Sequence, residues 1–103
     1  MKKIINGVRY NTETAQKLAE NYNNLGYNDF YYLNEEIYRT TNGKYFLFGE
    51  GGAATKYGIS EGNFKHASET IIPLSEKEVF DLLEKWNEVE MIEELFPDRI
   101  QDA

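Results

Sequence analysis

A glycine-rich stretch over residues 46–58, FLFGEGGAATKYG, has the residue types of a phosphate-binding loop. A Walker-type loop needs a lysine and a hydroxyl residue side by side after its last glycine. Here Lys56 stands four residues past the last glycine of GEGG, and Tyr57 follows it. GEGGAA also lacks the final glycine of a dinucleotide loop, and Glu50 would repel a phosphate. We interpret the stretch as a strand end whose glycines permit positive backbone angles or close packing. The alternative is a surface loop that docks on a partner.

Other groups that could perform chemistry are sparse. His66 is the only histidine and there is no cysteine, so thiolate zinc sites and histidine dyads lack their parts. The carboxylate pairs Glu35–Glu36 and Glu93–Glu94 are adjacent in the chain. Neighbouring residues point apart in both strands and helices, so neither pair makes an acid–base dyad. No spacing resembles a calcium loop, although a weak divalent cation site stays open. We predict no catalytic residues, no metal and no cofactor, and hence a protein that is not an enzyme.

Aromatic residues form the next concentration of chemistry. The run YNDFYY covers residues 27–32, and further tyrosines follow at Tyr38, Tyr45 and Tyr57. Tyrosines beside basic residues such as Arg39 can stack nucleic acid bases or bind a protein. They can also be the surface of a tyrosine-rich sheet whose hydroxyls reach water. The overall acidity disfavours nucleic acid.

Two elements are predicted in the N-terminal quarter. Asn6-Gly7 favours a tight turn between two short strands, although one bent strand would fit as well. Residues 11–27 predict a helix, capped by Asn11 or Thr12. Its apolar face follows the i, i+3, i+4, i+7 spacing, with Ala15, Leu18, Ala19 and Tyr22.

The central segment predicts a hairpin around Asn42-Gly43. A two-residue loop there pairs Thr40 with Tyr45, Tyr38 with Leu47 and Ile37 with Phe48. Both faces of this hairpin would then be apolar. One face can take the helices, and the other needs a loop, a second layer or a partner.

The C-terminal half begins with a long irregular connection over residues 51–68, with room for one helical turn. Residues 69–74, ETIIPL, predict a short strand that Pro73 restricts to an edge or a strand end. A capping box of Ser75 and Glu78 then starts a helix, which breaks near Asn87. A second short helix stops at Pro97. Together the elements predict one α+β domain over residues 1–103: a mostly antiparallel sheet of three to five short strands with a central hairpin, packed against N-terminal and C-terminal helices. Residues 98–103 should form a frayed tail.

Charge is unevenly distributed. Residues 1–68 hold seven acidic and eight basic residues, whereas residues 69–103 hold eleven acidic and three basic ones. The acidic region 69–103 repels nucleic acid phosphates and favours basic partner surfaces, or serves only as a solvated helix face.

The N-terminal apolar run stops after two isoleucines, and no membrane span is present. We therefore expect a cytoplasmic protein that does not contact membranes.

Three runs resemble a known family: IINGVRYNTETA, EEIYRTTNGKYFLFGEGGAATKYG and IIPLSEKEVFDLLEKW. The family consists of small acidic proteins carried by phages and mobile elements of Firmicutes, and the resemblance covers nearly the whole chain. Some of its members look like type II-A anti-CRISPR proteins, which block the RNA-guided effector nuclease of the host. The resemblance implies a stoichiometric inhibitor of that nuclease, acting in the host cytoplasm without catalysis. It would block guide RNA loading or access of target DNA.

Two surfaces are candidates for binding the effector. The first is an acidic helical face that competes for the positive channels of the nuclease: Glu76, Asp81, Glu84, Glu88, Glu90, Glu93 and Glu94. The second is the hairpin with its glycine loop: Tyr38, Arg39, Tyr45, Phe48, Glu50, Lys56 and Tyr57. Two other functions stay open. One is a regulatory or structural phage protein without a CRISPR link, and the other is a small metal-dependent nuclease or nucleotide hydrolase.

Overall fold

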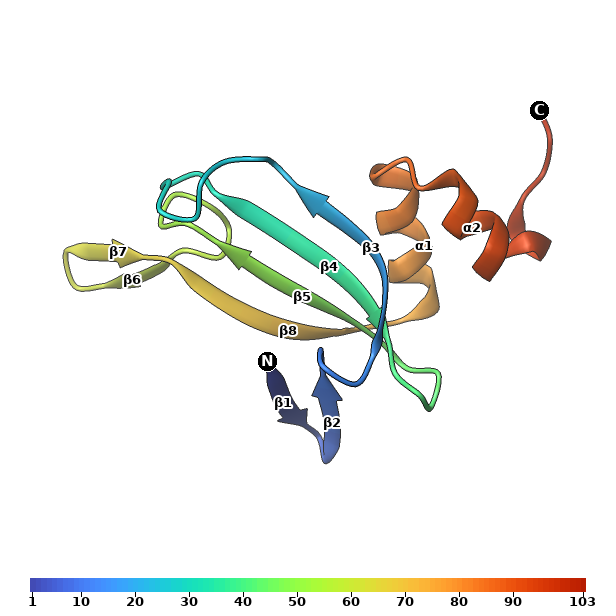
Figure 1. Cartoon of the computed structure of the whole chain (residues 1–103), viewed down its shortest axis with the longest axis horizontal. Coiled ribbons are helices and arrows are strands. Elements are labelled where there is room, and N and C mark those ends of the chain that lie inside the picture. The colour runs from blue at the N-terminus through green and yellow to red at the C-terminus, as the bar shows by residue number, and fades with distance from the viewer.

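The computed structural model describes residues 1–103 as an α+β domain in which strands predominate (Figure 1). Antiparallel strands make up three sheets, and the helices follow at the C-terminal end. The strands are β1 (Lys2–Ile5), β2 (Val8–Asn11), β3 (Gln16–Tyr22), β4 (Leu33–Arg39), β5 (Tyr45–Gly51), β6 (Ile59–Glu61), β7 (Phe64–His66) and β8 (Ser68–Leu74). The helices are α1 (Glu76–Lys85), α2 (Val89–Leu95) and the short 3₁₀ helix η1 (Pro97–Arg99), which includes the first residues of the tail.

The main sheet has the strand order β3-β4-β5-β8, so β3 and β8 form its edges. Pro73 therefore lies on an edge strand, as its missing N–H requires. The pairs β1–β2 and β6–β7 are separate two-stranded hairpins. The first turns at Asn6-Gly7, where both residues have positive φ angles of 51° and 77°. This confirms the predicted Asn-Gly turn.

The predicted N-terminal helix is wrong, because residues 16–22 form β3. Asn11 does cap a turn, since its side-chain oxygen accepts from the Glu13 N–H, but the turn is not continued. Pairing with β4 shifts by one residue between Lys17 and Ala19, so a β-bulge places the adjacent Leu18 and Ala19 both in the core. Two adjacent buried residues fit the i, i+3, i+4 spacing of a helix as well as a β-bulge. Pairing with β4 decides for the strand, despite the helix propensity of these residues.

The central hairpin forms, but the predicted register is wrong by one residue. Arg39 pairs with Tyr45, Tyr38 with Phe46 and Ile37 with Leu47. The Thr40 N–H donates to the Lys44 carbonyl, and the Lys44 N–H donates to the Thr40 hydroxyl oxygen. Together with Gly43 at φ 80°, these bonds close a three-residue loop instead of a two-residue loop. Because side chains alternate along a strand, the shift moves Ile37 and Leu47 onto one face and Tyr38 and Phe46 onto the other.

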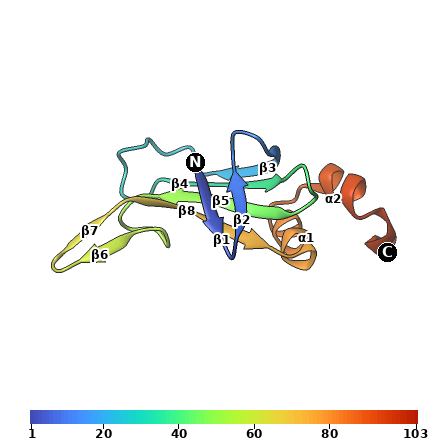
Figure 2. The same ribbon diagram turned by 90° about the horizontal axis from the view of Figure 1, so that it is seen from below.

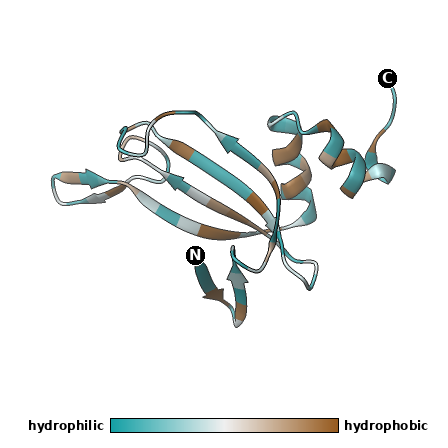
Figure 3. Cartoon of the chain, viewed as in Figure 1, coloured by the Kyte–Doolittle hydropathy of each residue, from teal (hydrophilic) through white to brown (hydrophobic).

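Each face of the main sheet has its own apolar cluster. Ile37 and Leu47 pack against Val79 and Leu83 of α1, which are fully buried at 0% exposure. On the opposite face, Tyr38, Phe46 and Ile71 pack against Tyr10 of the β1–β2 hairpin. Figure 2 shows the sheet nearly edge-on with α1 beneath it, and Figure 3 shows the hydrophobic segments of the middle strands and α1. The prediction that both faces need cover is confirmed, and the second cover is the N-terminal hairpin.

The C-terminal helices start and break where the sequence predicts. Ser75 and Glu78 form the reciprocal capping box of α1, with side-chain to backbone distances of 3.1 and 2.9 Å. Asn87 has a positive φ of 57° and separates α1 from α2. Both helices lie at one end of the 49 Å long axis, whereas the β6–β7 hairpin lies at the other (Figure 1).

The connection over residues 51–68 is more ordered than predicted. It contains the β6–β7 hairpin, which turns through Gly62 at φ 58° and Asn63. Gly-Asn is a recognised two-residue hairpin signal, so the sequence did contain this information. The hairpin residues are all exposed, and no apolar alternation marked the two short strands.

Candidate functional site

The end of the sheet opposite the helices, here called the loop end, is built from three segments. They are the connection 23–32, the glycine loop 51–58 and the β6–β7 hairpin. The side chain of Asn23 holds the first segment in place. Its amide nitrogen donates to the Tyr31 carbonyl at 2.7 Å, and its amide oxygen accepts from the Leu33 N–H at 3.1 Å. The Asp29 carboxylate accepts from the Tyr31 N–H at 2.8 Å, which tightens the turn that follows.

The glycine loop is a close-packing device. A Cβ on Gly49 would lie 2.2 Å from the Tyr57 ring, and one on Gly52 would lie 2.4 Å from the Asp29 carbonyl oxygen. Neither glycine has a positive φ. The Gly52 N–H also donates to the Tyr32 carbonyl at 2.8 Å. The close-packing interpretation of these glycines is confirmed. Gly49 leaves room for the Tyr57 ring on the sheet, and Gly52 lets the glycine loop pack closely against segment 23–32.

A buried carboxylate of β4, Glu35, anchors this loop to the sheet. Glu35 is 3% exposed, and one of its oxygens accepts from the Tyr57 hydroxyl at 2.6 Å and from Lys56 Nζ at 2.7 Å. Burial alone raises the pKa of Glu35, but the hydrogen bonds from Lys56 and Tyr57 and the charge of Lys56 outweigh it, so the pKa is lowered. Burial and the bond to Glu35 raise the pKa of Tyr57, so its hydroxyl remains a donor. These contacts of Lys56 and Tyr57 with Glu35 fix the loop on the sheet.

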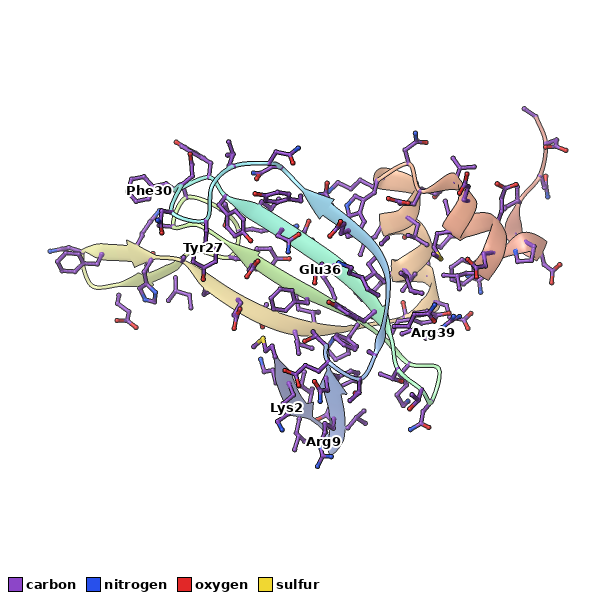
Figure 4. The ribbon with its side chains drawn as sticks, in the orientation of Figure 1. Lys2, Arg9, Tyr27, Phe30, Glu36 and Arg39 are labelled. Carbon is purple, nitrogen blue, oxygen red and sulfur yellow. The ribbon has the colours of Figure 1, made fainter.

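The loop end also exposes large aromatic side chains. Tyr27, Phe30 and Phe64 are 72%, 70% and 78% exposed, and Tyr31 is similarly exposed. Figure 4 shows Tyr27 and Phe30 together at this end, far from Lys2 and Arg9 of the N-terminal hairpin. Exposed aromatic side chains gathered on ordered backbone are typical of protein-binding surfaces.

Two hollows meet at Tyr27. One has a volume of about 240 Å³ and lies between Tyr27, Tyr32, Glu50 and the start of β8. The other has a volume of about 300 Å³ and is bordered by residues 27–30, residues 52–53 and residues 65–67. The three segments of the loop end therefore form one indented surface.

The hairpin and glycine-loop residues chosen from the sequence do not form a single surface. Tyr38 and Phe48 lie on the sheet face that the N-terminal hairpin covers. Arg39 and Tyr45 lie on the opposite face, towards the helices. The remaining three belong to the loop end: Lys56 and Tyr57 bind Glu35, and Glu50 lines the smaller hollow.

The acidic residues of the helices are partly neutralised. Glu76 pairs with Arg99 at 2.9 Å, and Asp81 pairs with Lys77 at 2.8 Å. Glu88 is half-buried at the start of α2. The other members of the predicted face are exposed and form no ion pair: Glu84, Glu90, Glu93 and Glu94.

The site residues that sequence reasoning missed are Tyr27, Phe30, Phe64 and Glu69. The aromatic run at residues 27–32 gave a signal, but nothing in it distinguished a core from a surface role. Glu69 joins the site only through the pairing of β8 with β5, which places it opposite Glu50. Phe64 joins it because the β6–β7 hairpin projects from the same end of the molecule (Figure 1).

No group of three or more histidine, cysteine, aspartate or glutamate side chains is arranged to hold a metal ion. None of the helices combines the length and apolar character needed to cross a membrane. No protein-family model, curated protein or solved structure matches this chain.

Proposed function

We propose that this protein is a non-catalytic binding module that docks on a partner protein through its loop end. One observation carries the proposal: Tyr27 and Phe30, each at least 70% exposed, lie together at one end of the molecule and border the same hollow (Figure 4). Phe64, also exposed, lies on the β6–β7 hairpin at that end. Removing such rings from water on binding is favourable by about 1.5–3 kcal/mol for a fully buried side chain. The backbone that carries them is already ordered by Asn23 and Gly52, which lowers the entropic cost of binding.

The partner we propose is the type II-A RNA-guided effector nuclease, in the cytoplasm of a bacterial host. The sequence resemblance supports this choice, since the family includes inhibitors of that nuclease. Docking of the loop end would block guide RNA loading or access of target DNA by occupying protein surface. Among the docking surfaces considered, the exposed aromatic side chains favour the loop end over the acidic helices, where internal ion pairs already neutralise two carboxylates.

A DNA cleavage assay with purified type II-A effector tests the proposal. The protein is added before or after the guide RNA, at low and moderate salt. We expect inhibition by the unmodified protein and strongly reduced inhibition by the double variant Tyr27→Ala/Phe30→Ala. The matched control is Val89→Ala. It truncates an exposed apolar side chain at the opposite end of the molecule, the helix end, which consists of α1, α2 and η1.

Each outcome has a defined meaning. Inhibition only on early addition indicates interference with guide loading, whereas inhibition in either order indicates occlusion of DNA or of the nuclease domains. Equal loss of inhibition in the control variant would contradict docking through the loop end. Absence of inhibition with several effectors would overturn the effector as partner. A stable complex with another phage protein would then favour the regulatory alternative.

A further inference from the structure

The smaller hollow of the loop end combines two tyrosine rings with two carboxylates. Its lining includes the tyrosines Tyr27 and Tyr32 and the carboxylates Glu50 and Glu69. Its volume of about 240 Å³ is below the range of about 300–1,000 Å³ that is usual for sites of small molecules and cofactors. The hollow therefore has the size for a single side chain.

The two carboxylates of the hollow lack a cation. Glu50 and Glu69 lie directly opposite each other across β5 and β8, where like charges destabilise a sheet. Neither takes part in any of the ion pairs of the protein. One oxygen of Glu50 accepts from the Tyr32 hydroxyl and from the Asn34 side chain, which orients the carboxylate and leaves its second oxygen available.

Aromatic rings form the remaining wall. The rings of Tyr27 and Tyr32 lie 5.3 Å apart and are tilted by 57° to each other. Burial and the bond to Glu50 raise the pKa of Tyr32, so its hydroxyl keeps its proton. The face of a tyrosine ring attracts a cation, most strongly a planar one that can stack on it.

We propose that this hollow binds the guanidinium group of an arginine side chain presented by the partner protein. Guanidinium is the cation that both stacks on aromatic rings and donates two parallel hydrogen bonds to a carboxylate. An ammonium group would satisfy the charge but not the stacking. That the arginine belongs to the docked partner rests on the proposed function, whereas the affinity of the hollow for guanidinium does not.

The test is a titration of the ¹⁵N-labelled protein with N-acetyl-arginine amide, followed by NMR. Its matched probe is N-acetyl-citrulline amide, which has the same shape without the charge. We expect saturable millimolar binding of the arginine compound, with shift changes confined to residues around Tyr27, Tyr32, Glu50 and Glu69. Citrulline amide should give no saturable change, and N-acetyl-lysine amide should bind more weakly.

Two variants locate the binding. Glu69→Gln keeps the size of the side chain and should weaken arginine binding about tenfold. Glu13→Gln removes another exposed carboxylate, in the turn before β3, and should change nothing. Equal binding of citrulline amide, undiminished binding by Glu69→Gln, or shifts concentrated on α2 would each overturn the proposal.

The failure of this inference is distinguishable from failure of the proposed function. If the protein inhibits the effector but arginine amide does not bind, the hollow has been misassigned and the docking proposal is unaffected. If arginine amide binds but Glu69→Gln inhibits the nuclease as strongly as the unmodified protein, the hollow binds guanidinium and its role in docking is overturned.

Discussion

The loop end and the helix end are attached to the same four-stranded sheet by different interactions, polar at the first and apolar at the second. At the helix end, Val79 and Leu83 enter the apolar cluster completely, and charged side chains remain outside. At the loop end, a buried carboxylate, Glu35, holds the covering segment through Tyr57 and Lys56. The large apolar rings of that end remain outside instead. One end therefore buries its apolar side chains for stability, whereas the other leaves its large aromatic side chains exposed to solvent.

The first prediction tests the stabilising role of the helix end. Leu83→Ala removes a fully buried side chain from α1, in the cluster between the helix and the sheet, and should lower the free energy of unfolding by about 2–5 kcal/mol. Urea denaturation measures the change. The matched variant Val89→Ala truncates an exposed side chain and should change stability by less than about 0.5 kcal/mol. A loss below about 1 kcal/mol for Leu83→Ala would show that the helices are not a major source of stability.

The second prediction concerns the contact between the two loops of the loop end. Gly52→Ala places a methyl group 2.4 Å from the Asp29 carbonyl and 2.5 Å from the Phe30 carbonyl. Backbone must move to relieve this overlap, at a cost of about 1–3 kcal/mol, and the segment carrying Tyr27 and Phe30 moves with it. We expect lower stability and reduced inhibition of the effector together.

Gly26→Ala is the control for this variant, because no atom lies within 4 Å of the added methyl group. NMR shifts of residues 23–32 and the cleavage assay measure the two effects. Normal inhibition by a folded Gly52→Ala variant would show that the geometry of this segment does not matter for docking.

The third prediction uses the buried carboxylate. The pKa of Glu35 in the folded protein lies below its ordinary value of 4.5, so its contribution to stability is complete above that pH and is lost as the pH falls through the folded pKa. Tyr57→Phe removes one of the two donors. The pKa of Glu35 should then rise towards 4.5, so the acid-induced loss of stability should become smaller and be complete at a higher pH. Stability near pH 7 should fall by about 1–3 kcal/mol.

Denaturant titrations across pH 3–7 measure this shift. The control Tyr31→Phe removes a hydroxyl from an exposed ring and should leave the profile unchanged. Superimposable pH profiles for Tyr57→Phe and the unmodified protein would show that the Glu35 bond does not stabilise the fold.

Features that depend on a few neighbouring residues were predictable from the sequence, whereas features that depend on pairing between distant segments were not. The Asn6-Gly7 turn, the edge position of Pro73 and the capping box of Ser75 and Glu78 were predictable, because each depends on the conformational or hydrogen-bonding requirements of a few neighbouring residues. Leu18 and Ala19 were wrongly assigned to a helix, because their spacing fits a helical face. The β-bulge that buries both depends on pairing with β4, which the local sequence does not reveal. A one-residue error in loop length also paired the side chains of β5 with the wrong face of β4.

The candidate site was less predictable than the fold for the same reason. Glu50 was identified from the glycine loop, but Glu69 lies nineteen positions away in the chain and meets it only through the register of β5 with β8. Likewise, the exposure of Tyr27 and Phe30 depends on where Asn23 and Gly52 hold their loop. Composition alone could not distinguish these rings from those of the core.

The last and smallest expected effect tests the helix end as a competing docking surface. Glu90, Glu93 and Glu94 are exposed on α2, and the triple change to lysine reverses their charge. The long axis of the protein is 49 Å, whereas charges in physiological salt are screened over about 8 Å. A partner docked on the loop end should therefore sense the triple variant weakly. Inhibition should change less than about tenfold, and mainly at low salt.

The cleavage assay at low and moderate salt measures this effect, with Tyr27→Ala/Phe30→Ala as the comparison. If the triple variant abolishes inhibition at moderate salt while the double variant retains it, the acidic helices are the docking surface. The exposed rings would then need another explanation. The reverse result assigns docking to the loop end. The helix charges then act only on the rate of approach, because electrostatic attraction at a distance accelerates encounter without contributing to the final contact.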